Sequence, residues 1–259
     1  MVRKLLFIGI LGAVSANVLA QKARLNLMNE GDHLSFEVSY NKKVVIPSSP
    51  LGLNVDNRIL GKGVSVTPVM SQSGNGIKTY EVKHTDGILL YVDVRESDDG
   101  VAFRYRLPAD GPKCIYGEQT TFTFPNDTKV WYASGPFQYG WIQAYQERNI
   151  STVDNELLAP PATFQLPDGC YAAITEANLF NFHGAVLLGE KGNKVRFGYV
   201  ENKGHLETGT VTGIPDARYY HEVVKNVPWI VYPTAGAKEI KTPWRILMLA
   251  DDLNGLANN

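Results

Sequence analysis

The sequence predicts an all-β protein, a large antiparallel β-sandwich. Three observations lead to this prediction: apolar and polar residues alternate with a period of two in almost every segment after Gln21, Gly (24) and Pro (14) interrupt the chain often, and Tyr (13) and Phe (10) are plentiful. Such alternation is typical of strands that bury one face, and many short strands between turns favour a sandwich. The length of 259 residues suits one all-β domain, which we place at 21–259.

The individual elements follow from local patterns. In HLSFEVSYN, the apolar side chains from Leu34 to Tyr40 alternate with polar partners, which predicts a strand. A hairpin is predicted over 87–107, because the turn signal Asp99-Gly100 separates two alternating segments. Only 152–159 and 251–256 have the pattern for a turn or two of helix, and Pro160-Pro161 stops the first. Further strands are expected near 23–28, 51–55, 78–84, 119–124, 129–133, 170–175, 184–189, 194–200, 205–211, 218–224, 229–233 and 244–250.

The N-terminal segment predicts a signal peptide over 1–20. Arg3 and Lys4 precede an apolar run, and small residues lead to an expected cleavage site before Gln21. The apolar run is shorter than the about 20 residues that a membrane span needs, and a retained membrane anchor is the alternative interpretation. No other stretch has the pattern of a span, so we expect an exported, periplasmic protein with no membrane span after cleavage.

Charge and motif content narrow the possible functions. The net charge is −1, with 25 Lys and Arg scattered among 26 acidic residues, which argues against the basic face that nucleic-acid binding needs. The five histidines have no zinc-type spacing, and the sequence has no G-x-S-x-G, P-loop, G-x-G-x-x-G or H-E-x-x-H motif. Cys114 and Cys170 permit one disulfide after export, but their sequence separation does not show whether they meet.

One aromatic stretch, VWYASGPFQYGWIQAYQERNIS (130–151), predicts a sugar-binding surface. Aromatic rings stack on the C–H faces of sugars, while amide and acidic side chains bond the hydroxyl groups. The candidate substrate-binding residues are Trp141, Gln143 and Tyr145. The alternative is a core strand with an amphipathic continuation.

A second candidate is Glu176, which follows the apolar strand CYAAI. A carboxylate that emerges at a strand end is placed to face a site or a metal ion. The alternative is a solvated or capping carboxylate.

Three segments carry a resemblance to a known family: SYNKKVVIPSSPLGLNVD (39–56), DDGVAFRYRLP (98–108) and TPWRILMLADDLNGLANN (242–259). In combination they resemble the N-terminal domain of glycoside hydrolase family 97, the exported bacterial α-glucosidases and α-galactosidases. The resemblance covers essentially the whole chain after the signal peptide. It implies a many-stranded supersandwich, similar to galactose mutarotase domains, that packs on a (β/α)₈ barrel. The barrel carries the catalytic carboxylates of the family, so we expect no catalytic residue in this chain.

The resemblance also implies calcium at the active site, with one ligand from the N-terminal domain. The family's glutamate lies just before a Tyr, shortly after the strand that KVWY resembles, but here Ala144 precedes Tyr145. We therefore name Glu147 as the expected metal ligand, with Gln143 as a nearby substitute and Glu176 as the second choice. The expected partners are α-linked glucosides or galactosides and the barrel.

Two other functions compete with this non-catalytic module. The first is an autonomous carbohydrate-binding protein that uses the aromatic residues of 130–151. The second is a mutarotase-type enzyme, which needs a general acid and a general base, usually His and Glu. The nominees for the enzyme are His183 or His221 with Glu176 or Glu222.

Overall fold

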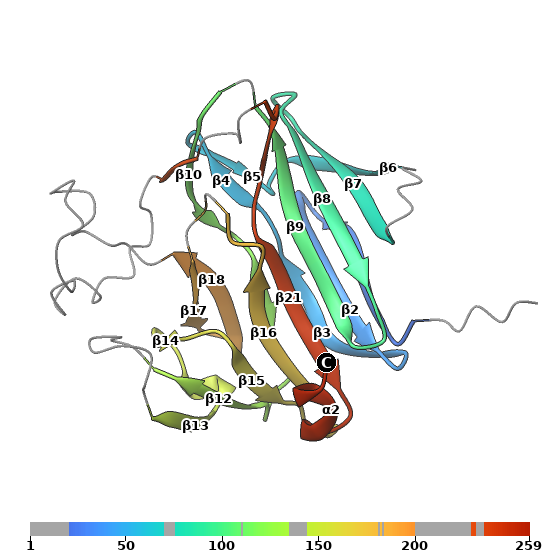
Figure 1. The fold of residues 1–259 in the computed structure, drawn as a ribbon, viewed down its shortest axis with the longest axis vertical. Helices are drawn as coiled ribbons and strands as arrows, with labels where there is room; N and C mark the ends of the chain where they lie inside the picture. Colours follow the sequence, from blue (N-terminus) through green and yellow to red (C-terminus); the bar gives the residue numbers. More distant parts are fainter. Residues whose placement is uncertain are drawn as a thin grey trace, which may run out of the picture.

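The computed structural model describes residues 21–69, 76–109, 111–134, 144–180, 182, 184–199, 229–231 and 236–259. Within them the chain is built from antiparallel strands in two layers, which confirms the predicted all-β sandwich (Figure 1). The predicted signal peptide and the strands expected at 205–211 and 218–224 lie outside the described residues. No helix in the described part of the chain is long and apolar enough to cross a membrane.

The first layer is a ten-stranded sheet. Each pairing in it is antiparallel, and β20 (Glu239–Lys241) joins it by pairing with β9. The order is β13 (Tyr145–Asn149), β12 (Lys129–Ala133), β15 (Ala162–Gln165), β16 (Tyr171–Ala177), β21 (Trp244–Ala250), β9 (Gly100–Pro108), β8 (Leu89–Glu96), β7 (Ile77–His84) and β6 (Val64–Val69).

The second layer consists of three smaller sheets. A main-chain hydrogen bond from the Leu34 N–H to Gly61 O (2.7 Å) joins the first of them to the second, and the chain runs directly from the second into the third through Gln119 and Thr120. Strands β2 and β3 of this layer lie behind β9 and β21 in Figure 1. The sheets are β1 (Ala23–Glu30), β2 (His33–Tyr40) and β3 (Lys43–Pro50); β19 (Trp229–Val231), β10 (Lys113–Glu118), β4 (Leu53–Val55) and β5 (Arg58–Leu60); and β11 (Thr121–Thr123), β18 (Lys194–Tyr199), β17 (Ala185–Glu190) and β14 (Leu157–Leu158).

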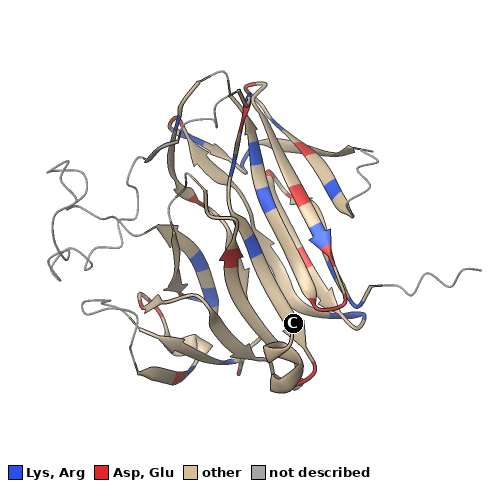
Figure 2. Cartoon of the chain, in the orientation of Figure 1, with Lys and Arg blue, Asp and Glu red and all other residues tan. Residues whose placement is uncertain are grey.

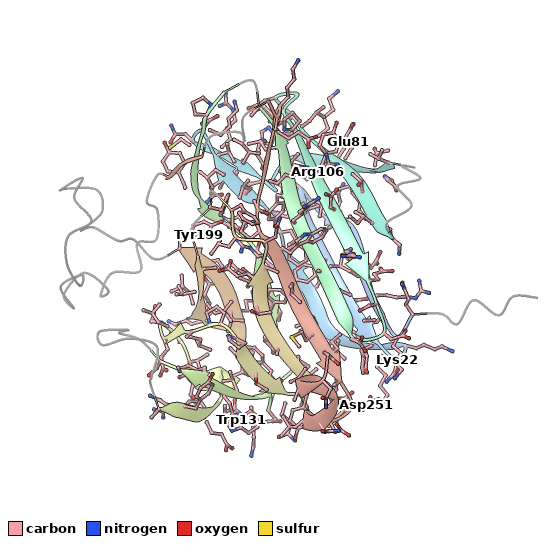
Figure 3. The ribbon with its side chains drawn as sticks, in the orientation of Figure 1. Lys22, Glu81, Arg106, Trp131, Tyr199 and Asp251 are labelled. Carbon is pink, nitrogen blue, oxygen red and sulfur yellow. The ribbon has the colours of Figure 1, made fainter. Side chains whose placement is uncertain are left out.

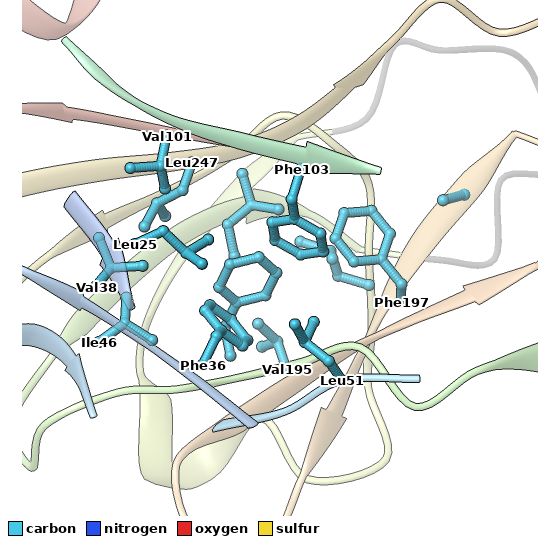
Figure 4. Close-up of a cluster of buried hydrophobic side chains, with 14 of the residues drawn as sticks. Leu25, Phe36, Val38, Ile46, Leu51, Val101, Phe103, Val195, Phe197 and Leu247 are labelled. Atoms are coloured by element: carbon cyan, nitrogen blue, oxygen red, sulfur yellow. The ribbon is translucent and has the colours of Figure 1, made fainter. Parts of the chain in front are cut away.

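The core fills the space between the two layers (Figure 4). Phe103 of β9 lies 5.5 Å from the ring of Phe36 on β2 and 6.3 Å from that of Phe122 on β11. Phe122 in turn lies 6.0 Å from Phe197 on β18. All four rings are fully buried, so contacts between aromatic side chains join three of the four sheets.

The predicted hairpin over 87–107 is confirmed as β8 and β9. Gly100 begins β9 with φ of +150°, and a Cβ there would lie 2.2 Å from the Leu247 carbonyl oxygen. Only glycine therefore lets β9 approach β21 this closely.

The two helix predictions have different outcomes. The one over 251–256 is confirmed by α2 (Leu253–Ala257), which Asp252 caps by accepting a hydrogen bond from the Gly255 N–H (2.7 Å). The one over 152–159 is wrong, because a 3₁₀ turn (Ile150–Thr152) precedes β14 there. Leu157 and Leu158 pair with β17, and this tertiary pairing overrides the local pattern.

The open question of a disulfide is answered by two free thiols, a half-buried Cys114 and a buried Cys170. Burial, followed by the nearby Asp168 and Asp251, raises the pKa of the Cys170 thiol to about 12.

Candidate functional site

A fully buried arginine lies at the centre of the candidate site. On β21 the inward positions are Arg245, Leu247 and Leu249, so strand alternation places a guanidinium where the pattern expects an apolar side chain. A buried charge needs a partner, and Glu118, at the end of β10, supplies it. Arg245 Nη2 lies 2.5 Å from Glu118 Oε1, and Arg245 Nε lies 3.2 and 3.3 Å from the two carboxylate oxygens.

Glu118 is itself fully enclosed by donors. The Tyr199 hydroxyl, at the end of β18 (Figure 3), donates to Glu118 Oε1 at 2.6 Å, and Thr120 Oγ1 donates to Oε2 at 2.7 Å. Tyr105 OH lies 2.7 Å from Thr120 Oγ1 and accepts from the Gly52 N–H at 3.0 Å. Because Glu118 is only 1% exposed, these donors take the place of water around its carboxylate.

Glu176 is the second carboxylate on Arg245. It lies opposite Arg245 in the register of β16 and β21, so both side chains point inward. Arg245 Nη1 donates to Glu176 Oε2 at 2.6 Å, and the Ala185 N–H donates to Oε1 at 2.9 Å. The Glu176 side chain is 15% exposed, whereas those of Glu118 and Arg245 are 0% exposed. We call Arg245, Glu118, Glu176 and Tyr199 the buried network. Solvent reaches part of the Glu176 side chain.

Arg245 is the permanent cation of the buried network. Burial is the largest single influence on the pKa of its guanidinium and lowers it, but the combined attraction of Glu118, Tyr199 and Glu176 raises this pKa overall. Burial and the charge of Glu118 raise the pKa of Tyr199, so its hydroxyl stays protonated and donates. The Phe197 ring lies 4.6 Å from Arg245 Cζ, which adds a cation–π contact on one face of the guanidinium.

A separate polar cluster lies on the outer face of the ten-stranded sheet, where charged residues follow β7, β8 and β9 (Figure 2). Asp93 of β8 is 2% exposed although it points away from the core. Arg104 Nε and Arg106 Nε reach it at 3.0 and 2.9 Å, and Thr79 Oγ1 donates to it at 2.9 Å. The Arg104 guanidinium stacks 4.5 Å above the Trp244 ring. Since the arginines cover Asp93 completely, this cluster stabilises the sheet and presents no open carboxylate.

The sequence-predicted site residues do not converge. Tyr145 is 63% exposed at the start of β13, and Glu147 is exposed two residues later with Lys129 Nζ 3.0 Å away. Trp141 and Gln143 lie outside the described residues, as do His183, His221 and Glu222.

Glu147 and Glu176 are also separated from each other. The register places Glu147 opposite Trp131, Trp131 opposite Thr163, and Thr163 opposite Ala173 on β16. Ala173 and Glu176 are an odd number of residues apart, so Glu147 and Glu176 lie on opposite faces of the sheet. The structure therefore does not bring these two candidate metal ligands together. Among the described residues no group of three or more His, Cys, Asp or Glu side chains could hold a metal ion.

Sequence reasoning did not find Glu118, Arg245 or Tyr199. A signal was available for Arg245, since it interrupts the apolar inward positions of WRILMLA, and a charge at such a position predicts a buried partner. That partner, Glu118, lies 127 positions away from Arg245 in the sequence, so the local pattern does not identify it.

The fold and the buried network define the chain as a β-sandwich domain with an ion-paired centre. A family model for the glycosyl-hydrolase 97 N-terminal domain matches residues 20–259. The chain belongs to this family, which confirms the resemblance found in the sequence.

Two curated proteins and one solved structure show how far the similarity extends. The chain is 28% identical over 184 residues to a probable retaining α-galactosidase of Streptomyces bingchenggensis, covering 64% of this chain and 28% of that protein. It is 22% identical over 187 residues to a retaining α-galactosidase of Bacteroides thetaiotaomicron, covering 62% of this chain and 28% of that protein. A glycoside hydrolase family 97 enzyme from Pseudoalteromonas sp. strain K8, solved with panose, shares the fold at a TM-score of 0.66 and 18% identity, covering 92% of this chain and 36% of that one. The chain thus spans less than a third of the curated relatives it matches.

Proposed function

We propose that this chain is the non-catalytic N-terminal module of an exported α-glycosidase of the α-glucosidase or α-galactosidase type. In this role it packs on a (β/α)₈ barrel, closes one side of a pocket for α-linked sugars, and contributes a carboxylate to a calcium site there. The observation that carries the proposal is family membership over residues 20–259, together with the 28% share of the related galactosidases that the chain covers.

The state of the two network carboxylates supports a non-catalytic role. Glycoside hydrolysis needs two carboxyl groups on either side of the scissile bond, separated by about 5–9.5 Å with room for the sugar. Glu118 and Glu176 instead share one guanidinium, and Glu118 is enclosed by Tyr199 and Thr120. A sugar cannot reach Glu118, so this pair is unsuited to acid–base work on a glycosidic bond.

Glu176 is better suited than Glu147 to act as one ligand of a calcium ion. Calcium takes oxygen ligands, about 6–8 in all. A carboxylate offers about four acceptor positions, and the described contacts of Glu176 use two of them, one on each oxygen. Glu147 lies on the opposite face of the sheet and is 51% exposed beside Lys129. We therefore place the calcium contact at Glu176. The other ligands would come from outside the described residues, and the bound ion would supply a fixed positive charge beside the sugar.

Exposed apolar side chains next to Glu176 support packing against another domain. Leu179 and Phe180 follow β16 and are 46% and 75% exposed. Gly184 brings this turn close to the network, because a Cβ there would lie 3.8 Å from both Glu176 Oε1 and Leu179 Cδ2. Apolar groups beside a partly buried carboxylate are typical of a surface that a partner covers.

The second candidate function is autonomous carbohydrate binding through the 130–151 stretch. The exposed ring of Tyr145 favours it, since an aromatic face open to solvent is available for stacking on a sugar.

Four measurements test these proposals. We expect the purified chain not to cleave aryl α-glucosides or α-galactosides, and cleavage by the chain alone would refute the non-catalytic role. Isothermal titration of the chain with maltose and galactose tests autonomous binding, which fails if neither sugar binds. With the chain joined to its barrel, we expect calcium binding to be weakened in Glu176→Gln and kept in the control Glu147→Gln, and the reverse would return the metal contact to Glu147. N-terminal sequencing of the periplasmic form should begin at Gln21.

A further inference from the structure

We infer that the outer face of the ten-stranded sheet carries a binding surface for α-linked oligosaccharides, with Trp131 of β12 and Tyr145 of β13 as its stacking side chains. This inference rests on the second candidate function, autonomous carbohydrate binding, because it concerns the same stretch of sequence. It goes further by naming the side chains that contact the sugar and by placing them on the face of the sheet opposite to Glu176.

The first step is the direction of the two aromatic side chains. Val130 and Tyr132 are fully buried between the layers, so strand alternation places Trp131 on the outer face. The register pairs Ala133 with Tyr145, which places the Tyr145 side chain on that face as well. Trp131 is half-buried and Tyr145 is 63% exposed, so both rings belong to one surface that solvent reaches (Figure 3).

The second step is the spacing of these two residues. Trp131 lies directly opposite Glu147, and Tyr145 is two positions before Glu147 on the same strand. Trp131 and Tyr145 are therefore diagonal neighbours, which lie about 7–8 Å apart and within reach of each other when they are aromatic. Adjacent pyranose rings of an oligosaccharide can stack on both side chains, whereas a monosaccharide stacks on one. The spacing therefore favours an oligosaccharide.

The third step is the chemistry around the rings. Lys129 Nζ lies 3.0 Å from Glu147 Oε1, and their side chains are 53% and 51% exposed. Their opposite charges compensate each other, so the surface offers hydrogen-bonding groups without a net charge. Thr163, opposite Trp131, and Gln165, opposite Lys129, add a hydroxyl group and an amide on the same face. Hydroxyl, amide and charged groups bond sugar hydroxyls, so a neutral sugar suits this surface better than an anionic ligand does.

The helix α2 limits the extent of the surface. Leu256 of α2 packs on Ala173 and Ala250, on the outer faces of β16 and β21. Ala173 lies opposite Thr163 in the register, so α2 covers the sheet just beyond β15 (Figure 1). The surface therefore comprises the outer faces of β12, β13 and β15.

The test is isothermal titration of the purified chain with maltoheptaose and with stachyose, which carries α-linked galactose. We expect at least one of them to bind, and to bind more tightly than maltose or galactose. Trp131→Ala and Tyr145→Ala should each weaken this binding by about tenfold or more, as the truncation of an aromatic anchor commonly does. Because the ligand is neutral, the affinity should be the same at low and high salt.

Trp244→Ala is the matched control. Trp244 lies on the same outer face, because its neighbour Arg245 points inward, but the Arg104 guanidinium covers one side of its ring at 4.5 Å. The folded control variant should bind the oligosaccharide as the wild type does. Circular dichroism checks the fold of each variant, and Tyr145→Ala covers the case in which Trp131→Ala does not fold, since Tyr145 is mostly exposed.

The outcomes separate this inference from the function on which it rests. If the wild type binds an oligosaccharide and Tyr145→Ala and folded Trp131→Ala bind it equally well, autonomous binding stands and the site is wrong. A loss of affinity in Trp244→Ala as large as in Trp131→Ala, or an affinity that falls steeply with salt, would also overturn the inference. If the wild type binds neither oligosaccharide, autonomous binding and the inference fail together, and the non-catalytic role of the module is still decided by the cleavage assay.

Discussion

The buried network makes a specific prediction about stability. Arg245→Met removes the only cation bonded to Glu118 among the described residues and leaves that carboxylate 1% exposed. Removing one partner of a buried ion pair costs about 3–5 kcal/mol, because the other charge stays desolvated. For a domain of this size each kcal/mol lowers Tm by about 2–4 °C, so the expected fall is at least about 6 °C.

The double variant Glu118→Gln/Arg245→Met sharpens the test. It removes both fully buried charges, so only the Glu176 carboxylate, which solvent reaches, is left without its cation. The new side-chain amide oxygen can still accept from the Tyr199 hydroxyl. We expect it to be more stable than Arg245→Met alone by about 2 kcal/mol, within the range of coupling between contacting residues. Urea unfolding followed by tryptophan fluorescence gives both free energies, with Arg58→Met, in an exposed pair, as the control that loses under about 1 kcal/mol. The reasoning is refuted if the stability lost by the double variant equals the sum of the losses of Arg245→Met and Glu118→Gln measured separately.

The remaining predictions concern backbone approach, the outer face and pH. Gly100→Ala should lower the free energy of unfolding, measured in urea, by about 3 kcal/mol, because its Cβ would lie 2.2 Å from a carbonyl oxygen. In the control Gly111→Ala no atom lies within 4 Å of the new Cβ, so this free energy should change by less than about 0.5 kcal/mol. Equal losses in the two variants would contradict the packing argument. Asp93→Asn should cost about 2 kcal/mol, since it weakens two charge-assisted bonds at a residue 2% exposed, and the exposed control Asp86→Asn should cost under about 1 kcal/mol. Burial raises the pKa of the Cys170 thiol from 9.0 to about 12. Between these values the unfolded chain binds fewer protons than the folded chain, so the free energy of unfolding falls as pH rises. Cys170→Ala should show a shallower fall of this free energy between about pH 9 and pH 11, and a slope equal to that of the wild type would contradict the pKa shift.

Much of the fold could be predicted from the sequence because each long strand buries one face. Leu34, Phe36 and Val38 alternate with polar neighbours and are fully buried on β2, as the period-two pattern predicts. The failures came where local pattern carries little information. Leu157 and Leu158 form a strand of two residues that exists only because β17 lies beside it.

The candidate site was less predictable. Glu176 could be singled out, because it ends an apolar strand, but its partner could not. Arg245 faces Glu176 through the β16–β21 register, and Glu118 reaches Arg245 from the opposite layer. Such contacts depend on how the layers stack, which a single sequence does not encode locally. The sequence ranked Glu147 above Glu176 as a ligand because Glu147 lies beside Tyr145, where the resemblance to the family places its glutamate, and the sequence does not show that the two carboxylates lie on opposite faces of the sheet.

The ten-stranded sheet has a further consequence for how the chain behaves in solution. It does not close into a barrel, so β6 and β13 each have one side to which no strand pairs in the described part of the chain. The unpaired backbone groups of such an edge strand can pair with a strand of another molecule. Pro68 in β6 lacks an N–H, and Glu147 and Arg148 place exposed charges on β13. Both features disfavour the pairing of a strand from another copy of the chain with these edge strands.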